Sequence, residues 1–153
     1  MKYEMLLDEA DSENIRVIEN AKFKSRSDGL INGNVIGINR NVRSTRKRAC
    51  ILAEEIGHYC TTVGNILDQS DAGNRKQEFR ARPWAYDKLI GLDGIINAYQ
   101  HGCENLSETA EYLEVTEEFL IETLHTYKNK YGAKVEYGDY VVSFIPYLKV
   151  NKK

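Results

Sequence analysis

Residues 49–63 (ACILAEEIGHYCTTV) constrain the fold more than any other segment, because they predict a helix that is apolar on nearly every side. One apolar ridge recurs at helical spacing: Leu52, Ile56, Tyr59 and Val63. Small or apolar residues cover most of the remaining surface, and a helix of this kind is normally buried within a domain. Three ionisable residues nevertheless lie in the middle of it: Glu54, Glu55 and His58.

Glu54 and His58 are four residues apart, so their side chains share one face of the helix, with Glu55 beside them. Because an unpaired buried carboxylate costs several kcal/mol, this helix requires a cation, a salt-bridge partner or water in a cleft. Gly57 is a second indication, since glycine inside a helix costs about 0.5–1 kcal/mol and is tolerated where another backbone or a ligand approaches closely. The alternative interpretation is a solvated Glu-Glu edge beside a hydrogen-bonded histidine.

The sequence EEIGH at residues 54–58 is similar to the motif H-E-x-x-H, in which two metal ligands lie one turn apart with a general-base Glu between them. In this chain Glu54 stands in the place of the first His. The motif therefore favours a metallopeptidase helix with one altered ligand.

A second predicted helix, residues 75–90, carries a further carboxylate, Glu78, ahead of the small residues Ala81 and Ala85. Small residues at these positions would let the two helices pack closely and bring Glu78 towards His58. Such a third ligand is what a catalytic site with an open fourth position requires. Alternatively, Glu78 is a first-turn residue that interacts favourably with the helix dipole.

The remaining pattern predicts an α+β fold, with strands at both ends of the chain and helices between them. The expected elements are a helix at 3–10, a strand at 15–19, a hairpin at 30–39 turning at Asn32-Gly33, a helix at 44–62, a helix from about 74 to Gly91, helices at 94–101, 107–114 and 117–131, and strands around Tyr137-Gly138-Asp139. No Pro-rich linker interrupts the sequence, so a single compact unit, residues 1–153, is expected.

Residues 30–90 resemble the ImmA/IrrE family of metallopeptidases. They share a short β-hairpin before an LAEEIGHY-type helix, followed by E-x-x-A-x-x-W-A-x-x-x-L from Glu78 to Leu89. The resemblance implies a small zincin-like core of a short β-sheet or hairpin plus active-site helices over residues 1–91. Residues 92–153 would form a C-terminal helical pair and a terminal β-hairpin.

The resemblance also assigns roles. Glu55 aligns with the catalytic base, His58 with the second metal ligand and Glu78 with the third, whereas Glu54 occupies the place where most members carry His. Zn²⁺ is the metal that the family implies. A site of Glu54, His58 and Glu78 has a formal charge of zero with Zn²⁺, one unit below a His2Glu site, so we expect weaker zinc binding, with Mn²⁺ or Fe²⁺ as alternatives. Asp71 is a weaker candidate ligand.

By the same resemblance, the expected function is site-specific cleavage of a DNA-binding, phage-type repressor, which releases silenced genes. The alternative is a family member that has lost turnover through Glu54 and acts as an antirepressor by binding the repressor. In either case the expected partner is a helix-turn-helix repressor protein.

Residues 106–127 have a helix-turn-helix cadence, with Thr116 as N-cap of the second helix. The residues that would face DNA are Glu117, Glu118 and Glu122, so direct DNA binding is disfavoured and a packing or partner-binding pair is expected. The densest basic run comprises Arg40, Arg43, Arg46, Lys47 and Arg48. It is either a solvated approach to the EEIGH helix or, because cations in a first turn oppose the helix dipole, a docking patch.

Composition excludes several classes of function. The 21 Lys+Arg and 23 Asp+Glu give a formal net charge of −2, so no global field attracts nucleic acid or an anionic membrane. No apolar run reaches the roughly 18–20 residues that span a bilayer, and the acidic N-terminus does not read as a signal peptide. Three Cys without a C-x-x-C motif predict reduced thiols and a cytoplasmic location.

Overall fold

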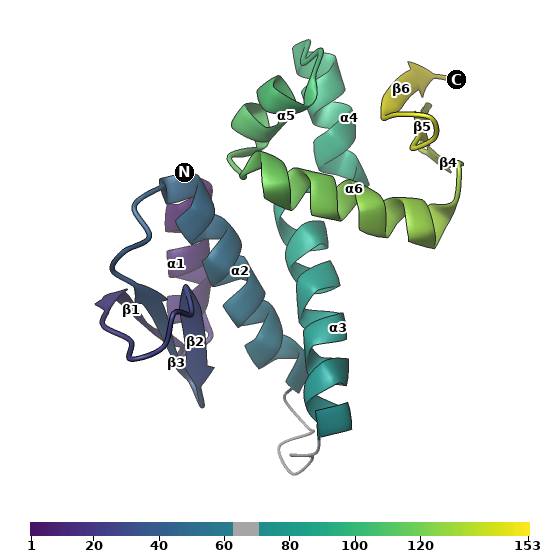
Figure 1. Ribbon diagram of the computed structural model, residues 1–153. Coiled ribbons are helices and arrows are strands. Elements are labelled where there is room, and N and C mark those ends of the chain that lie inside the picture. The colour runs from purple at the N-terminus through teal and green to yellow at the C-terminus, as the bar shows by residue number, and fades with distance from the viewer. Residues whose placement is uncertain (63–70) are drawn as a thin grey trace. The chain divides into compact units, whose positions relative to one another are not determined.

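The computed structural model describes the backbone of residues 1–62 and 71–153, and the side chains of residues 1–62 and 80–153. The described elements run in the order α1-β1-β2-β3-α2-α3-α4-α5-α6-β4-β5-β6, which confirms the predicted α+β class (Figure 1). The chain divides into two compact units, Met1–Ala85 and Tyr86–Lys153, with the boundary inside α3. The expectation of one compact unit over the whole chain stays a prediction.

The N-terminal unit is built on a small mixed sheet. It contains α1 (Lys2–Ser12), β1 (Arg16–Ala21), β2 (Gly29–Asn32), β3 (Val35–Asn39), α2 (Thr45–Thr62) and the greater part of α3 (Asp71–Leu89). The strand order is β1-β3-β2, with β1 parallel and β2 antiparallel to the central strand β3. β2 is therefore an edge strand.

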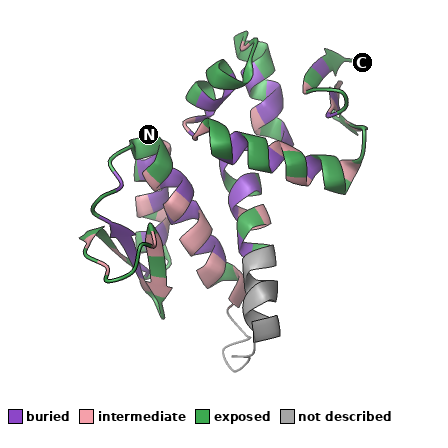
Figure 2. Cartoon of the chain, viewed as in Figure 1, coloured by how far each residue is buried: buried purple, intermediate pink, exposed green. Residues whose placement is uncertain are grey.

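The core of this unit lies between the sheet and two helices. α1 packs against α2 and β1, and α2 packs against β2 and β3, so the two helices lie side by side on one face of the sheet (Figure 1). Ile36 and Ile38 of β3 are fully buried. A Cβ at Gly37, which lies between these two residues in β3, would be 3.0 Å from a ring atom of Phe23. The aromatic ring of Phe23, from the β1–β2 loop, therefore packs against β3. β3 is accordingly buried for most of its length, whereas the surrounding loops are largely exposed (Figure 2).

The predicted hairpin is present, but its turn is one residue later than expected. Asn32 pairs with Val35, so the two-residue loop is Gly33-Asn34 rather than Asn32-Gly33. Gly33 has φ +62°, whereas Asn34 is not among the residues with positive φ. A hairpin with glycine at the first central position needs only that one positive φ, which explains why the turn forms at this register.

The C-terminal unit combines three helices with a small sheet. The helices α4 (Gly91–His101), α5 (Leu106–Leu113) and α6 (Glu117–Tyr131) are followed by β4 (Lys134–Tyr137), β5 (Tyr140–Ser143) and β6 (Lys149–Lys152). The strands form an antiparallel sheet in the order β4-β5-β6. The predicted terminal hairpin therefore gains a third strand, β6, which the sequence pattern did not indicate.

Side-chain caps define the ends of the helical pair in this unit. Thr116 Oγ1 accepts a hydrogen bond from Phe119 N at 3.0 Å, which confirms Thr116 as the N-cap of α6, and Asn105 Oδ1 caps α5 through Glu108 N at 2.8 Å.

In the core of this unit, the hydroxyl of Tyr127 donates a hydrogen bond to Asp87 Oδ1 at 2.6 Å. Burial and this hydrogen bond raise the pKa of Tyr127 far above its ordinary value.

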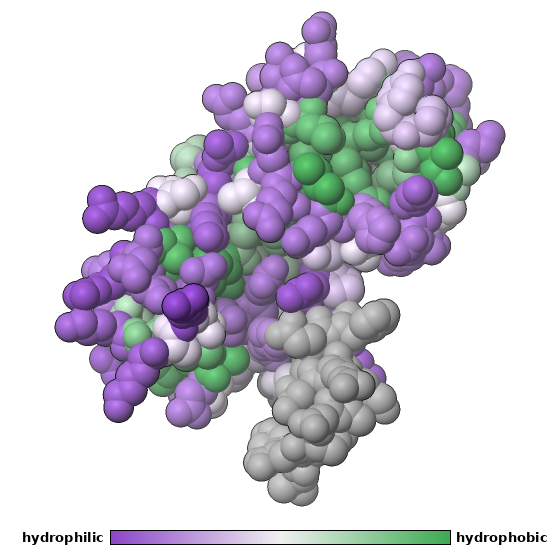
Figure 3. All heavy atoms as spheres, viewed as in Figure 1, coloured by the Kyte–Doolittle hydropathy of each residue, from purple (hydrophilic) through white to green (hydrophobic). Residues whose placement is uncertain are grey.

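A groove of about 680 Å³ opens within the C-terminal unit. Its walls include Ile95, Tyr99, Leu106, Leu124 and Phe144, and apolar side chains gather at the surface of this unit in the space-filling view (Figure 3). Cys103 also lines it. Burial raises the pKa of the Cys103 thiol, and the nearby Glu108 and Glu111 carboxylates add to the rise. The groove contains none of the residues that the sequence assigned to the metal site.

Among the described residues, no helix has the length and apolar character needed to cross a membrane.

Candidate metal centre

The three ionisable residues of the EEIGH segment lie in the middle of α2. The helix buries its apolar residues as predicted: Ala49, Cys50, Leu52, Ala53, Ile56 and Gly57. Glu54, Glu55 and His58 are each half-buried. They are therefore partly desolvated but still accessible, which suits ligands and bases better than either full burial or full exposure.

The carboxylate of Glu55 lies at the first residue of the edge strand β2. A Cβ atom on Gly29 would lie 3.4 Å from both Cγ and Oε1 of Glu55, and 2.5 Å from Cγ2 of Ile51. The last distance is too short for any real side chain, so only glycine lets the backbone of β2 approach α2 this closely. Gly29 thus places β2 directly beside the Glu55 carboxylate.

Gly57 serves the packing of α2 on α3. A Cβ atom here would lie 2.7 Å from the carbonyl oxygen of Ala81 and 3.1 Å from Cε3 of Trp84. Ala81 and Ala85 are fully buried. This confirms that the glycine inside α2 marks the close approach of a second backbone, and that small residues on α3 lie in the packed interior of the unit.

The third predicted ligand is located only by its backbone. Position 78 belongs to α3, one turn before Ala81, which contacts α2. The side chains of Glu78 and of Asp71 lie outside the described residues, so their assignment as ligands stays a prediction.

The donors on α2 fit two positions of a divalent metal site. Glu54 and His58 supply one carboxylate and one imidazole, a helical turn apart, where Cβ atoms are about 5–6 Å from each other. Among the described side chains, no three His, Cys, Asp or Glu groups gather as a metal-binding cluster. Glu54, Glu55 and His58 therefore do not form such a cluster by themselves, and the predicted third ligand, Glu78, lies outside the described side chains.

The end of α2 is held by hydroxyl groups of its last turn. Thr61 Oγ1 donates to the carbonyl of Gly57 at 2.7 Å, and Thr62 Oγ1 donates to the carbonyl of His58 at 2.6 Å. Each hydroxyl thus bonds back to the carbonyl four residues earlier, in addition to the helical hydrogen bonds of α2.

The sequence did not indicate Gly29 as part of the site. It comes just before the predicted hairpin, in the dipeptide Asp28-Gly29, which is a common turn signal. Its role depends on a contact with α2, more than 20 residues later, which no local pattern reveals.

Comparison with known families agrees with this geometry. The family model of the IrrE N-terminal-like domain, a peptidase family, matches residues 10–125. The match extends beyond residues 30–90, where the motifs resemble the family, and covers most of the chain. No curated protein matches the sequence. The chain therefore belongs to the ImmA/IrrE, or IrrE N-terminal-like, family of metallopeptidases.

Proposed function

We propose that this chain is a metal-dependent endopeptidase that cleaves a helix-turn-helix repressor at a specific site and thereby relieves repression. Family membership supports the reaction class. The observation that carries the proposal is the proximity of Gly29 to Glu55, whose Oε1 would lie 3.4 Å from a Cβ at Gly29, so that a candidate general base lies beside an edge strand. The cytoplasm, where such a repressor meets DNA, is the proposed location.

An edge strand is a binding surface for an extended polypeptide. β2 pairs with β3, and within the described residues no other strand pairs with it. Its outer N–H and C=O groups can therefore bind a peptide as an added strand. A peptide held in this way would pass close to Glu55, because Gly29 has no side chain to keep the two apart.

In the proposed reaction, Glu55 removes a proton from the attacking water and then delivers it to the leaving amine. Glu54, His58 and Glu78 would hold the metal. When bound, a divalent metal polarises the scissile carbonyl and increases the acidity of water. Glu55 is half-buried, so its carboxylate is partly shielded from bulk water but can still be reached by a substrate.

Glu54 favours a second candidate function. A ligand set with two carboxylates reduces the positive charge of the centre and makes it a weaker Lewis acid. Turnover could then be lost while the peptide-binding edge remains. In that case the chain acts by binding and sequestering the repressor.

Incubation with the repressor encoded beside it in its genome separates these functions. A peptidase yields two defined fragments, and a chelator abolishes their formation. A binding protein yields a stoichiometric complex in which the repressor remains uncleaved. Glu55→Gln should stop cleavage without preventing complex formation.

A further inference from the structure

Seven exposed cations gather at one end of the sheet in the N-terminal unit. Residues 20–48 contain eight Lys or Arg and one Asp, a formal charge of +7 in a chain whose total is −2. We name as the basic platform those of the eight that are exposed: Lys22, Lys24, Arg26, Arg40, Arg43, Arg46 and Lys47. They come from the β1–β2 loop, the end of β3 and the start of α2.

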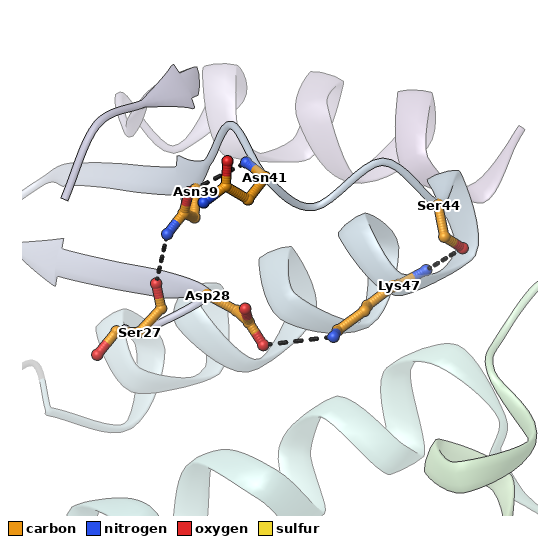
Figure 4. A network of polar contacts seen from close by, with 6 residues as sticks. All are labelled: Ser27, Asp28, Asn39, Asn41, Ser44 and Lys47. Atoms are coloured by element: carbon orange, nitrogen blue, oxygen red, sulfur yellow. Dashed lines mark hydrogen bonds and ion pairs between the residues drawn. The ribbon is translucent and has the colours of Figure 1, made fainter. Parts of the chain in front are cut away.

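Hydrogen bonds join these three segments around a buried side chain, Asn39, which is only 7% exposed. Its Nδ2 donates to the carbonyl of Ser27 and its Oδ1 accepts from Asn41 N, both at 3.0 Å (Figure 4). Its backbone N donates to the carbonyl of Asp28 at 2.7 Å, and Arg40 N donates to that of Ala21 at 2.9 Å. The backbones that carry the cations are therefore fixed relative to one another.

The first turn of α2 belongs to the same network. Ser44 Oγ accepts a hydrogen bond from Lys47 N at 3.2 Å, and Lys47 Nζ lies 3.5 Å from Asp28 Oδ2 (Figure 4). Asp28 is the single acidic residue among these segments, and Lys47 offsets it. The platform thus keeps a strong positive charge.

The eighth cation, Arg48, has a structural role. Its guanidinium donates to the carbonyls of Val42 and Glu19 and to the hydroxyl of Tyr3, and it is half-buried. The seven platform residues are more exposed than Arg48. Cations in the first turn of α2, which has no acidic residue, oppose the helix dipole, so stability alone does not explain them.

We propose that the basic platform binds the phosphate backbone of duplex DNA. Clustered arginine and lysine side chains neutralise phosphates, and arginine pairs with a phosphate through two hydrogen bonds. A protein partner would need apolar anchors. In the described part of the chain, none of the large hydrophobic side chains that are exposed lies in residues 22–28 or 40–47.

This surface is distinct from the acidic helical pair for which the sequence disfavoured DNA binding. It continues through Asp28 into Gly29, the residue that touches Glu55. DNA on the platform would therefore bring a DNA-bound protein close to β2. The inference adds a nucleic-acid ligand to the proposed peptidase and does not require that the peptidase be active.

Fluorescence anisotropy with a labelled 20-base-pair duplex of arbitrary sequence, titrated from 50 to 200 mM salt, tests the proposal. The full-length chain should bind with an affinity that falls steeply as salt rises. Arg43→Gln with Arg46→Gln removes two phosphate contacts, so it should weaken binding by at least about tenfold and make the slope of log affinity against log salt shallower by about 1.8.

The matched control is Lys128→Gln with Lys130→Gln, which makes the same change in net charge on exposed residues of α6. It should bind the duplex like the unaltered chain. Equal weakening by both double variants, or no binding of the unaltered chain at 50 mM salt, overturns the proposal. So does tighter binding of a Glu-rich peptide than of the duplex, which would assign the platform to an acidic protein.

Two measurements keep this test independent of folding and of peptidase activity. Urea unfolding should show that Arg43→Gln with Arg46→Gln is at least as stable as the unaltered chain, because it removes charges that oppose the helix dipole. Arg40 lies outside any helix, so its substitution does not change a helix dipole. Arg40→Gln should also weaken duplex binding. Cleavage of free repressor reports on the proposed function alone, so either proposal can fail without the other.

Discussion

Glu54 and Glu55 are neighbours in sequence, but α2 directs them to different surroundings. Successive residues of a helix are rotated by about 100° around its axis, so only Glu55 can face Gly29 while Glu54 shares its face with His58. Glu55 therefore lies towards β2, whereas Glu54 lies on the face of α2 that carries His58. This difference in position is the physical basis for assigning them different roles.

Glu54→His should raise the affinity for Zn²⁺ by at least about tenfold, because imidazole is a better zinc ligand and restores one positive charge to the centre. Competition with a chromophoric chelator measures the affinity, and metal analysis after purification measures the occupancy. Equal zinc affinity and occupancy in both forms would exclude Glu54 as a ligand.

For single residues, the sequence predicted those positions whose role shows in the residues next to them along the chain. Gly57 stood out because glycine is costly in a helix, and the structure explains it by the backbone of Ala81. Gly29 did not stand out, because its constraint arises from a contact with a distant helix. The ligand role of Glu78 stays a prediction.

At the scale of elements, the packing of α2 on α3 depends on one missing side chain. Gly57→Ala places a methyl group 2.7 Å from a helix carbonyl, which cannot move aside as a side chain can. After the gain in helix propensity, we expect a net loss of about 1–2 kcal/mol in the free energy of unfolding. Urea unfolding of the purified variant measures it.

Gly94→Ala is the matched control for this prediction. Gly94 also lies within a helix, but its Cβ would meet only side-chain methyl groups: Cδ2 of Leu113 at 3.2 Å and Cγ2 of Ile90 at 3.8 Å. These methyl groups can shift, so the variant should be neutral or more stable by up to about 1 kcal/mol. Equal effects of the two substitutions would contradict the proposed close packing at Gly57.

The elements that the sequence predicted well are those with caps and long periodic patterns. The helix at 117–131 begins and ends as expected, because Thr116 caps one end and Gly132 follows the other. The hairpin turn was off by one residue, since both Asn-Gly and Gly-Asn can form two-residue turns. β6 was missed because four residues, KVNK, are too short to show a strand pattern.

In the whole molecule, the near-neutral net charge is the sum of two regions of opposite charge. Residues 20–48 carry a formal charge of +7, whereas residues 89–127 contain eight Asp or Glu and no Lys or Arg. The sequence displayed both runs, but not that buried Asn39 gathers the basic one on a single surface. Only the folded chain shows this, because the participating segments are separated by β2 and β3.

Removal of divalent metal should destabilise the chain. A ligand that binds only the native state stabilises it by about 2.7 kcal/mol at a concentration 100-fold above its Kd. Chelator should therefore lower the thermal midpoint of the unaltered chain but have little effect on His58→Ala. Glu118→Gln, which alters an exposed carboxylate on α6, should respond like the unaltered chain. A chelator effect that persists in His58→Ala would argue against a site on α2.

We propose that Glu55, on α2 beside β2, is the general base of this metallopeptidase. Mass spectrometry tests this role most directly. The repressor encoded beside this chain in its genome is incubated with the metal-loaded chain or with Glu55→Gln, and its mass is then measured. We expect two fragments from one cleavage site with the unaltered chain, and at least about a 100-fold slower rate with the variant. Cleavage at an undiminished rate by Glu55→Gln, with its fold and metal content intact, would contradict this role.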